Sequence, residues 1–290
     1  MKPAAASFTC QCCSGTAARP RWPGLVSCRG CGVMTMDGGC DPDELRGLYG
    51  EHYFTGGEYA DYVADKPVIQ RTLAGHLDLV RRYVPPGSSL LEVGCAYGYF
   101  LELARGSYPA AEGIDVSEDA VAVAVRNGLP ARAGDLAAIG FPRPFDAACM
   151  WDTIEHVPNP REVFQRVHAA LKPGGHFLLT TGDFGSLLAR VQGSRWRQIH
   201  PPTHVFYFTR RSFRELCAAT GFDVVRFGTV PVYRRLGSAL RTLRQLHPTT
   251  IGGRLAAALG GLLPERLLEW SFPLDLGDTL YLVARKRVTA

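Results

Sequence analysis

The sequence lacks any run of about eighteen uninterrupted apolar residues, the length that a membrane-spanning helix requires. Its first residues, Met1 to Phe8, also lack the apolar core of a secretory signal peptide. These absences argue against a membrane span and lead us to expect a cytoplasmic protein. Strong charge is missing as well, because the formal net charge is only +5. That value weakly favours an anionic partner or membrane surface without requiring nucleic acid.

A disulfide framework is not expected in a reducing compartment, although the chain contains nine cysteines. Cys10-x-x-Cys13 and Cys28-x-x-Cys31 form two pairs separated by fourteen residues. Each pair brings two thiolates to one turn, and two such turns complete the tetrahedral shell that zinc prefers. The spacing therefore predicts a structural zinc site that folds roughly the first forty residues. Glycines in the second pair suit turns with unusual φ.

The remaining cysteines do not fit this two-by-two spacing. Cys12 and Cys40 are further candidate ligands, but buried structural thiols are the favoured interpretation for both. Cys95, Cys149 and Cys217 lie in predicted strand or helix segments, and we expect them in the core.

A Gly-x-Gly-x-x-Gly dinucleotide pattern is also absent. Instead, a short apolar run leads into Glu92-x-Gly94-x-Ala96-x-Gly98, a turn that opens a helical pattern. The next apolar run ends at Asp115. This layout is typical of a nucleoside-binding α/β half-domain, in which glycines admit the ligand and the second acid receives ribose hydroxyls. We expect a negative φ at Ala96, because alanine at positive φ is strained.

The charge of this turn favours one class of nucleoside. A dinucleotide carries a pyrophosphate, which bare N–H groups at a helix N-terminus bind and a carboxylate repels. Glu92 stands just before the turn, so it suits a cationic ligand without phosphate, such as a sulfonium nucleoside. A dehydrogenase is disfavoured for the same reason.

The rest of the chain alternates between strand and helix patterns. Helical periodicity runs through residues 43–84 and ends at Pro85-Pro86-Gly87. Strands are predicted over 89–93, 110–115, 130–133, 145–150, 175–181, 222–228 and 279–285, and helices over 97–105, 117–127, 160–170 and 209–220. Such alternation implies a parallel sheet with helices on both faces, and we expect the last of the seven strands to be antiparallel.

Three regions follow from this pattern: a zinc-ribbon-like module over 1–41, a helical cap over 42–86 and an α/β domain over 87–290. A helical insert over 231–277 precedes the last strand, and a connection of this length should fold by itself or serve a function. It carries leucines at helical spacing and the arginines Arg234, Arg235, Arg241, Arg244 and Arg254. A helical lid or dimer contact is the favoured interpretation, and a basic amphipathic surface for anionic lipid or a lipid-linked substrate is the alternative.

Taken together, these motifs resemble those of class I S-adenosylmethionine-dependent methyltransferases. The resemblance rests on Leu90–Gly98, Gly113–Asp115, Gly134–Leu136, Phe145-Asp146, Trp151–Pro160 and Leu171–Gly175. The cysteine-rich head is similar to zinc-ribbon methyltransferases of bacterial sugar, polysaccharide and natural-product pathways. Ala96 departs from the family, which has glycine there. The resemblance implies a seven-stranded, doubly wound, Rossmann-like sheet.

It also implies roles in cofactor binding. Gly94, Ala96 and Gly98 would line the methionine moiety, and Asp115 would bind both ribose hydroxyls. Asp135 and Leu136 would face the adenine, although Asp135 also suits a plain turn residue. The other residues implied at the cofactor are Glu92, Tyr97, Val116, Trp151 and Asp152.

Methyl transfer is an in-line displacement, so the protein must align the nucleophile and take its proton. His156 is the first candidate base, and His200 and His204 are the others. Glu155 is a candidate for orienting a histidine or contacting the acceptor. The alternative for His156 is a residue that packs where the next helix begins, and for His204 a residue packed in an aromatic loop.

The acceptor class follows partly from a missing motif. The sequence after residue 150 reads Trp151-Asp-Thr-Ile154, not the Asn/Asp-Pro-Pro-aromatic motif associated with planar amines. Oxygen, with carbon as a variant, on a small molecule, sugar or glycan is therefore expected. A zinc-ribbon RNA methyltransferase is one alternative, but the head from Cys10 to Cys31 offers only Arg19, Arg21 and Arg29 as cations. A non-catalytic binding module that kept the fold is another, because Ala96 alters the motif.

Overall fold

A seven-stranded sheet forms the centre of the molecule. The computed structural model describes residues 8–48, 62–246 and 249–288, so parts of the predicted head (1–7), cap (49–61) and insert (247–248) lie outside the described residues. The strand order is β10-β13-β8-β7-β4-β5-β6. The strands are β4 (Leu90–Val93), β5 (Ala111–Asp115), β6 (Ala131–Ala133), β7 (Phe145–Trp151), β8 (Leu171–Gly182), β10 (Phe222–Thr229) and β13 (Thr279–Lys286).

The first five of these strands run parallel, and β13 pairs antiparallel with both β8 and β10. The predicted sheet and its antiparallel last strand are therefore confirmed. β8 begins four residues earlier than the predicted 175–181, because Leu171 already pairs with Phe145 of β7.

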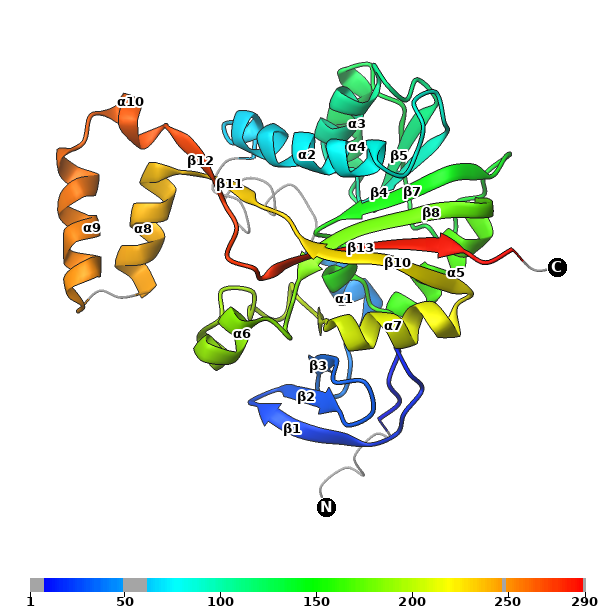
Figure 1. Cartoon of the computed structure of the whole chain (residues 1–290), viewed down its shortest axis with the longest axis horizontal. Coiled ribbons are helices and arrows are strands. Elements are labelled where there is room, and N and C mark those ends of the chain that lie inside the picture. The colour runs from blue at the N-terminus through cyan, green and yellow to red at the C-terminus, as the bar shows by residue number, and fades with distance from the viewer. Residues whose placement is uncertain (1–7, 49–61, 247–248, 289–290) are drawn as a thin grey trace.

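Helices cover both faces of the sheet, as the alternating pattern predicted (Figure 1). One face carries α2 (Lys66–Arg81), α3 (Tyr99–Ala104) and α4 (Glu118–Arg126). The other carries α5 (Pro160–Ala170) and α7 (Arg210–Ala219), with α1 (Pro42–Gly47) nearby.

Alternation along the central strands explains the two hydrophobic cores. Leu91 and Ala148 point to the face of α5 and α7, whereas their neighbours Leu90 and Cys149 point to the face of α2 and α3. All four are fully buried. Strands buried on both faces are typical of a parallel sheet between two helical layers.

Local sequence fixes where the helices begin. The side chain of Ser117 accepts a hydrogen bond from Ala120 N at the start of α4, and Asn159 accepts one from Glu162 N before Pro160 in α5. Thr209 and Ser212 form a reciprocal capping box at α7. These caps satisfy N–H groups that lack helical partners.

The cysteine-rich head pairs with the α/β domain. β1 (Ala18–Trp22), β2 (Leu25–Cys28) and β3 (Met34–Met36) form an antiparallel sheet, and its fourth strand is β9 (Phe206–Tyr207). β9 lies in the connection between β8 and α7, which also contains α6 (Leu187–Gln192). The head therefore shares its sheet with a segment that includes His204.

The predicted helical insert forms a stalk with helices at its end (Figure 1). β11 (Val232–Arg235) and β12 (Ser271–Leu274) pair antiparallel as the stalk. Between them lie α8 (Leu236–Leu246), α9 (Ile251–Leu262) and α10 (Glu265–Leu268). No described helix combines the length and apolar character needed to cross a bilayer.

Candidate functional site

Two adjoining cavities open where the parallel strands end. The first, about 240 Å³, is lined by residues that follow β4, β5, β6 and β7, and by the start of α5. The second, also about 240 Å³, lies between α2, the turn after β4 and the stalk. The cavities share Tyr62, Gly94, Ala96, Trp151 and Asp152. In open α/β sheets this edge is where ligands bind.

Asp115, at the end of β5, holds the turn that follows β4. Its Oδ2 accepts a hydrogen bond from Ala96 N at 2.8 Å, and its Oδ1 accepts one from Ser117 N at 2.9 Å. A carboxylate has about four acceptor positions, so two remain for ligand hydroxyls. Burial raises the pKa of Asp115, while these backbone hydrogen bonds oppose the rise.

The expected negative φ at Ala96 is wrong, because the structure has φ of +45° there. The left-handed conformation directs the Ala96 N–H to Asp115, and this hydrogen bond offsets part of a strain of about 1 kcal/mol. The turn keeps its form despite the alanine.

Gly94 is required by space as well as by its φ of +81°. A Cβ at this position would lie 2.5 Å from Cγ2 and 2.6 Å from Oγ1 of Thr153. Thr153 itself is held by a hydrogen bond of 2.9 Å from its Oγ1 to the Trp151 carbonyl. The turn after β4 therefore packs directly against the turn after β7.

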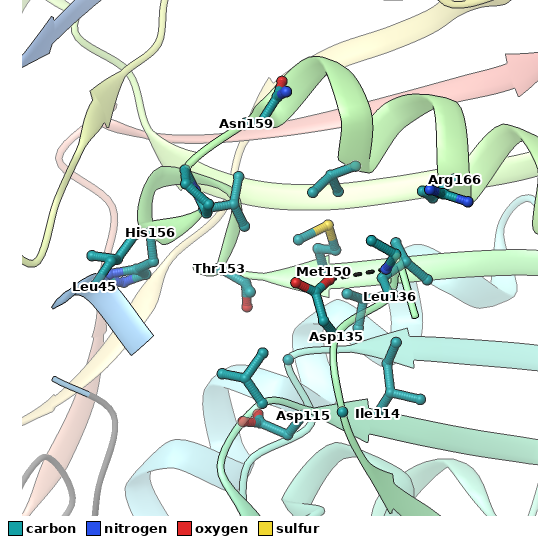
Figure 2. A pocket seen from close by; sticks show the side chains of 18 of the residues that line it. Leu45, Ile114, Asp115, Asp135, Leu136, Met150, Thr153, His156, Asn159 and Arg166 are labelled. Carbon is teal, nitrogen blue, oxygen red and sulfur yellow. Dashed lines mark hydrogen bonds between the residues drawn. The ribbon is translucent and has the colours of Figure 1, made fainter. Parts of the chain in front are cut away.

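Asp115, Asp135 and His156 surround the first cavity from different elements (Figure 2). Asp135 follows β6, and its Oδ1 accepts a hydrogen bond of 2.9 Å from Ala137 N. That bond makes Asp135 a turn residue, yet its exposed carboxylate still lines the cavity beside Leu136. Val116 lines the same cavity.

Three buried polar side chains line the second cavity and lack hydrogen-bond partners among the described residues. They are Glu92 at Oε2, Trp151 at Nε1 and His76 at both ring nitrogens. Burial, followed by the charge of Asp115, raises the pKa of Glu92 well above its usual range. Burial lowers the pKa of His76 to about 4. Buried polar groups normally have partners, so this cavity is suited to a polar ligand with a cationic group beside Glu92.

Glu155, His156 and His204 form a cluster at the edge of the first cavity. One ligand atom of each lies within 4.8 Å of the others, so the group has the spacing to hold a cation. His156 Nδ1 bonds the Thr203 carbonyl at 2.8 Å, and His204 Nδ1 bonds the Gln198 carbonyl at 2.9 Å. A carbonyl only accepts, so each Nδ1 carries the hydrogen and each Nε2 carries the lone pair.

Burial keeps these two histidines neutral, because it lowers the pKa of His156 to about 4 and that of His204 to about 2. The His200 ring contacts the His204 ring at a tilt of 42°, with ring centroids 3.7 Å apart. Of the four predicted catalytic residues, His156 lines a cavity; Glu155, His200 and His204 line neither.

Two predicted cofactor residues also line neither cavity. Tyr97 packs edge-on against Tyr62, with ring centroids 5.0 Å apart. Gly98 caps α3 with φ of +76°, and a Cβ there would lie 2.6 Å from Leu129 Cδ1. Both residues therefore pack on the side of the turn after β4 that faces away from the cavities.

The four cysteines of the two predicted pairs converge in the head. Their sulfurs all lie within 4.8 Å of one another, with Cys10 to Cys31 and Cys13 to Cys28 each 3.5 Å apart. These distances exceed a disulfide bond and approach the edge of about 3.8 Å of a tetrahedral zinc–thiolate site. The residues therefore fit a zinc ion. Cys12, although fully buried, and Cys40 are not in this group.

Glycines give the sulfurs room. A Cβ on Gly30 would lie 3.2 Å from Cys13 Sγ, and one on Gly15 would lie 3.3 Å from it. Gly32 has the expected unusual φ, at +80°, whereas Gly30 is required for space alone.

The head also contacts the helix that borders the first cavity. Arg161 of α5 donates from Nε to the Gln11 carbonyl and from a terminal nitrogen to the Cys12 carbonyl, both at 3.0 Å. Asn159, Glu162 and Arg166 of the same region line the cavity. The cysteine cluster and the site are thus joined through one helix.

A family model described as a methyltransferase domain matches residues 68–226, which is more than half of the chain. The chain belongs to this methyltransferase family. The predicted methyltransferase family is confirmed by this match.

Curated relatives match shorter segments. A ubiquinone biosynthesis O-methyltransferase from Ralstonia nicotianae is 31% identical over 36% of this chain and 48% of its own length. A dTDP-3-amino-3,6-dideoxy-alpha-D-glucopyranose N,N-dimethyltransferase from Streptomyces fradiae is 34% identical over 33% of this chain and 40% of its own length. Across the first three curated relatives the matches span 35% to 55% of their lengths.

Solved structures share the fold. Magnesium protoporphyrin IX methyltransferase from Synechocystis, with bound SAH, aligns with a TM-score of 0.53 at 15% identity, covering 85% of this chain and 100% of that chain. An S-adenosylmethionine-dependent methyltransferase from Clostridium acetobutylicum aligns with a TM-score of 0.51 at 9% identity, covering 78% and 97%. At these identities the likeness concerns the fold.

Sequence reasoning missed several residues of this methyltransferase site. His76 had a visible signal, because a histidine at helical spacing with Leu73 and Val80 on a buried face is an unusual core residue. Thr153 and the stalk residues Arg234 and Arg235 had none, because only the folded chain brings them to the cavities.

Proposed function

We propose that this chain transfers the methyl group of S-adenosylmethionine to an oxygen of a small molecule, sugar or glycan, with carbon as the variant acceptor atom. The observation that carries the proposal is the pair of acids at the end of the sheet, the buried Glu92 and the half-buried Asp115. Glu92 Oε2 has no partner in the described part of the chain, and Asp115 lies close enough to raise its pKa. Two adjacent acids favour a cationic, phosphate-free nucleoside and disfavour a pyrophosphate.

The cofactor would extend across both cavities. In the first, Asp115 would accept both ribose hydroxyls, and Asp135 and Leu136 would face the adenine. In the second, Glu92 would accept from the methionine ammonium, while Trp151 Nε1 and His76 would donate to its carboxylate. This placement would give a partner to Glu92 Oε2, to Trp151 Nε1 and to one ring nitrogen of His76, which have none among the described residues.

The acceptor would approach where the two cavities meet, beside Asp152 and Thr153. The bound cofactor supplies an electrophilic methyl group, so this chain's task is to align the acceptor and take its proton. His156 lines the first cavity, and its neutral ring presents Nε2 as a proton acceptor. Glu155, His200 and His204 would orient it. The ubiquinone-pathway and sugar relatives support small acceptors.

We further propose that Cys10, Cys13, Cys28 and Cys31 hold one structural zinc ion. All four positions of a tetrahedral site would come from the protein, which leaves none for a substrate. The ion would hold the head against α5 and β9.

Cofactor binding tests the central assignment. We expect Asp115→Ala to weaken S-adenosylhomocysteine binding at least a hundredfold by calorimetry, because charged hydrogen bonds to two hydroxyls are lost, at about 1.5–3 kcal/mol each. Asp119→Ala, on the exposed surface of α4, is the control and should bind normally. Equal affinity of both variants, or preferential binding of a nicotinamide dinucleotide, would overturn the assignment.

Product analysis tests the reaction. Incubation with cofactor carrying a deuterated methyl group and with pools of nucleotide sugars or hydroxylated aromatics should give labelled ethers, detected by mass spectrometry. His156→Gln should lower kcat with little change in cofactor affinity. Label found only on amine nitrogen would contradict the oxygen assignment, and binding without any labelled product would favour a non-catalytic module.

A further inference from the structure

The helical hairpin of α8 and α9 extends away from the sheet at the end of its stalk (Figure 1). The two helices pack against each other, and α9 buries only small residues, Gly253 and Ala256. Small residues let helices approach closely. The large apolar side chains of α9 are consequently left on its other side.

These side chains form a stripe along the exposed face of α9. The exposed fractions are 80% for Ile251, 58% for Leu255, 45% for Leu259 and 81% for Leu262. At 3.6 residues per turn the four project within an arc of roughly 80°. Leu267 and Trp270 follow, with 43% and 59% exposed. Seven of the sixteen exposed large apolar residues in the described ranges fall between Leu243 and Trp270, so the exposure is concentrated here.

The same segment is cationic. Residues 231–263 contain five arginines and neither aspartate nor glutamate, and residues 264–270 add Arg266 with the acids Glu265 and Glu269. Arg241, Arg244 and Arg254 are exposed on the two helices. An exposed apolar stripe on an arginine-rich hairpin, with a tryptophan near its end, is typical of helices that lie in the interface of an anionic bilayer.

We propose that this face of the hairpin, from Arg241 to Trp270, docks on an anionic lipid surface. The apolar stripe enters the boundary between headgroups and acyl chains, and the arginines contact the lipid phosphates. A second copy of the chain fits less well. In a two-fold interface the arginines of the two copies face each other, and the hairpin offers them only Glu265 and Glu269, of which Glu269 already pairs with Arg235.

Docking in this way connects the membrane to the site. The stalk that carries the hairpin supplies Tyr233, Arg234 and Arg235 to the second cavity. Arg235 also forms ion pairs with Asp65 at 3.2 Å and with Glu269 at 3.1 Å. These ion pairs hold the stalk to the start of α2 and to the end of the hairpin. A hairpin docked on lipid would therefore keep the second cavity at a fixed distance and orientation from the membrane surface.

Vesicle co-sedimentation of the full, zinc-loaded chain tests the proposal. We expect binding to phosphatidylcholine vesicles that contain phosphatidylglycerol, weakening with salt, and little binding to phosphatidylcholine alone. Arg241→Gln with Arg244→Gln should reduce binding about thirtyfold, since each arginine contributes about a factor of five. Leu255→Asp with Leu259→Asp should reduce it at least tenfold. Val125→Asp, at a residue 52% exposed on α4, is the matched control and should bind normally.

Trp270 provides a second readout. Its emission should shift to the blue on addition of the anionic vesicles, and Trp270→Phe should abolish the shift. Light scattering measures the molar mass of the wild type and of each variant, and so shows whether any of them is a dimer. Absence of vesicle binding by the wild type, equal binding by the leucine variant, or a wild-type dimer that this variant breaks would each overturn the proposal. These readouts do not depend on cofactor binding or methyl transfer.

Discussion

At the scale of single residues, the turn after β4 is governed by backbone conformation and close packing. Gly94 and Ala96 both have positive φ, at +81° and +45°. Only Gly94 also lacks room for a side chain, because Thr153 occupies the place of its Cβ. We therefore expect glycine to be tolerated at position 96, whereas alanine at position 94 should destabilise the chain.

We expect Ala96→Gly to change the free energy of unfolding by less than about 1 kcal/mol and to keep cofactor affinity, because glycine relieves the strain. Gly94→Ala should destabilise the chain by about 2 kcal/mol or more and weaken S-adenosylhomocysteine binding at least tenfold. Chemical denaturation and calorimetry measure both effects. Thr153→Ala should partly rescue Gly94→Ala, and absence of any rescue would contradict the steric account.

The buried histidines predict a loss of stability in acid. His76 is 1% exposed, and its pKa in the folded chain is about 4, against about 6.5 when unfolded. As pH falls from about 6.5 towards 4, the unfolded chain takes up a proton that the folded chain refuses, so unfolding becomes easier. His76 alone should cost about 2 kcal/mol by pH 5.

Urea denaturation at pH 7 and pH 5 measures this effect. His76→Leu should make the pH dependence smaller by about 2 kcal/mol, because leucine binds no proton. A control variant, His176→Leu, replaces a less buried histidine and should leave most of the dependence in place. Identical pH dependence in wild type and His76→Leu would contradict the buried, neutral assignment.

At the scale of elements, the cysteine head and the site are mechanically linked. β3 pairs with β9, and the Thr209 hydroxyl donates to the Cys31 carbonyl at 3.4 Å. Arg161 ties α5 to the first cysteine pair. Loss of the head's structure therefore removes support from both segments that flank the histidine cluster.

A pair of adjacent substitutions tests the proposed zinc site. Cys13→Ser should abolish stoichiometric zinc and lower stability by several kcal/mol, because metal binding is coupled to folding of the head. Cys12→Ser should retain one zinc ion per chain, because this thiol is outside the four-sulfur group. Atomic emission and thermal unfolding measure these outcomes. Full zinc content in Cys13→Ser, or its loss in Cys12→Ser, would show a different ligand set.

At the scale of the whole molecule, the insert leaves and rejoins the sheet at fixed points. Val230 N donates to the Thr279 carbonyl at the departure. At the return, buried Asp278 accepts from Trp196 Nε1 at 2.8 Å and from Arg197 at 3.0 Å. The principal contacts of α8 to α10 are with one another and with the stalk. The sheet should therefore fold without the hairpin.

Excision provides the test. Arg235 pairs with Ser271 across the stalk, so replacing residues 236–270 with Asn-Gly should close a two-residue β-turn. We expect the free energy of unfolding to fall by about 1 kcal/mol, or Tm by about 3 °C, with cofactor affinity retained. Circular dichroism and calorimetry follow these quantities. Aggregation or loss of the cooperative transition would mean that the hairpin is part of the folding unit.

The sequence by itself determined the sheet, the helices, the cysteine pairs and the acids that line the two cavities. Each depends on neighbours in the chain: alternation at Leu90 and Leu91 fixes the faces of β4, and Cys-x-x-Cys spacing fixes two thiols at one turn. The position of Asp115 at a strand end likewise follows from the local pattern.

Only the tertiary structure decided how distant segments meet. The φ of Ala96 is set by a hydrogen bond to Asp115, nineteen residues away. The pairing of the head with β9, the position of His76 beside Trp151 and the approach of Thr153 to Gly94 join segments that have no local signal for one another. Such contacts depend on packing of the whole chain, and no short-range pattern encodes them.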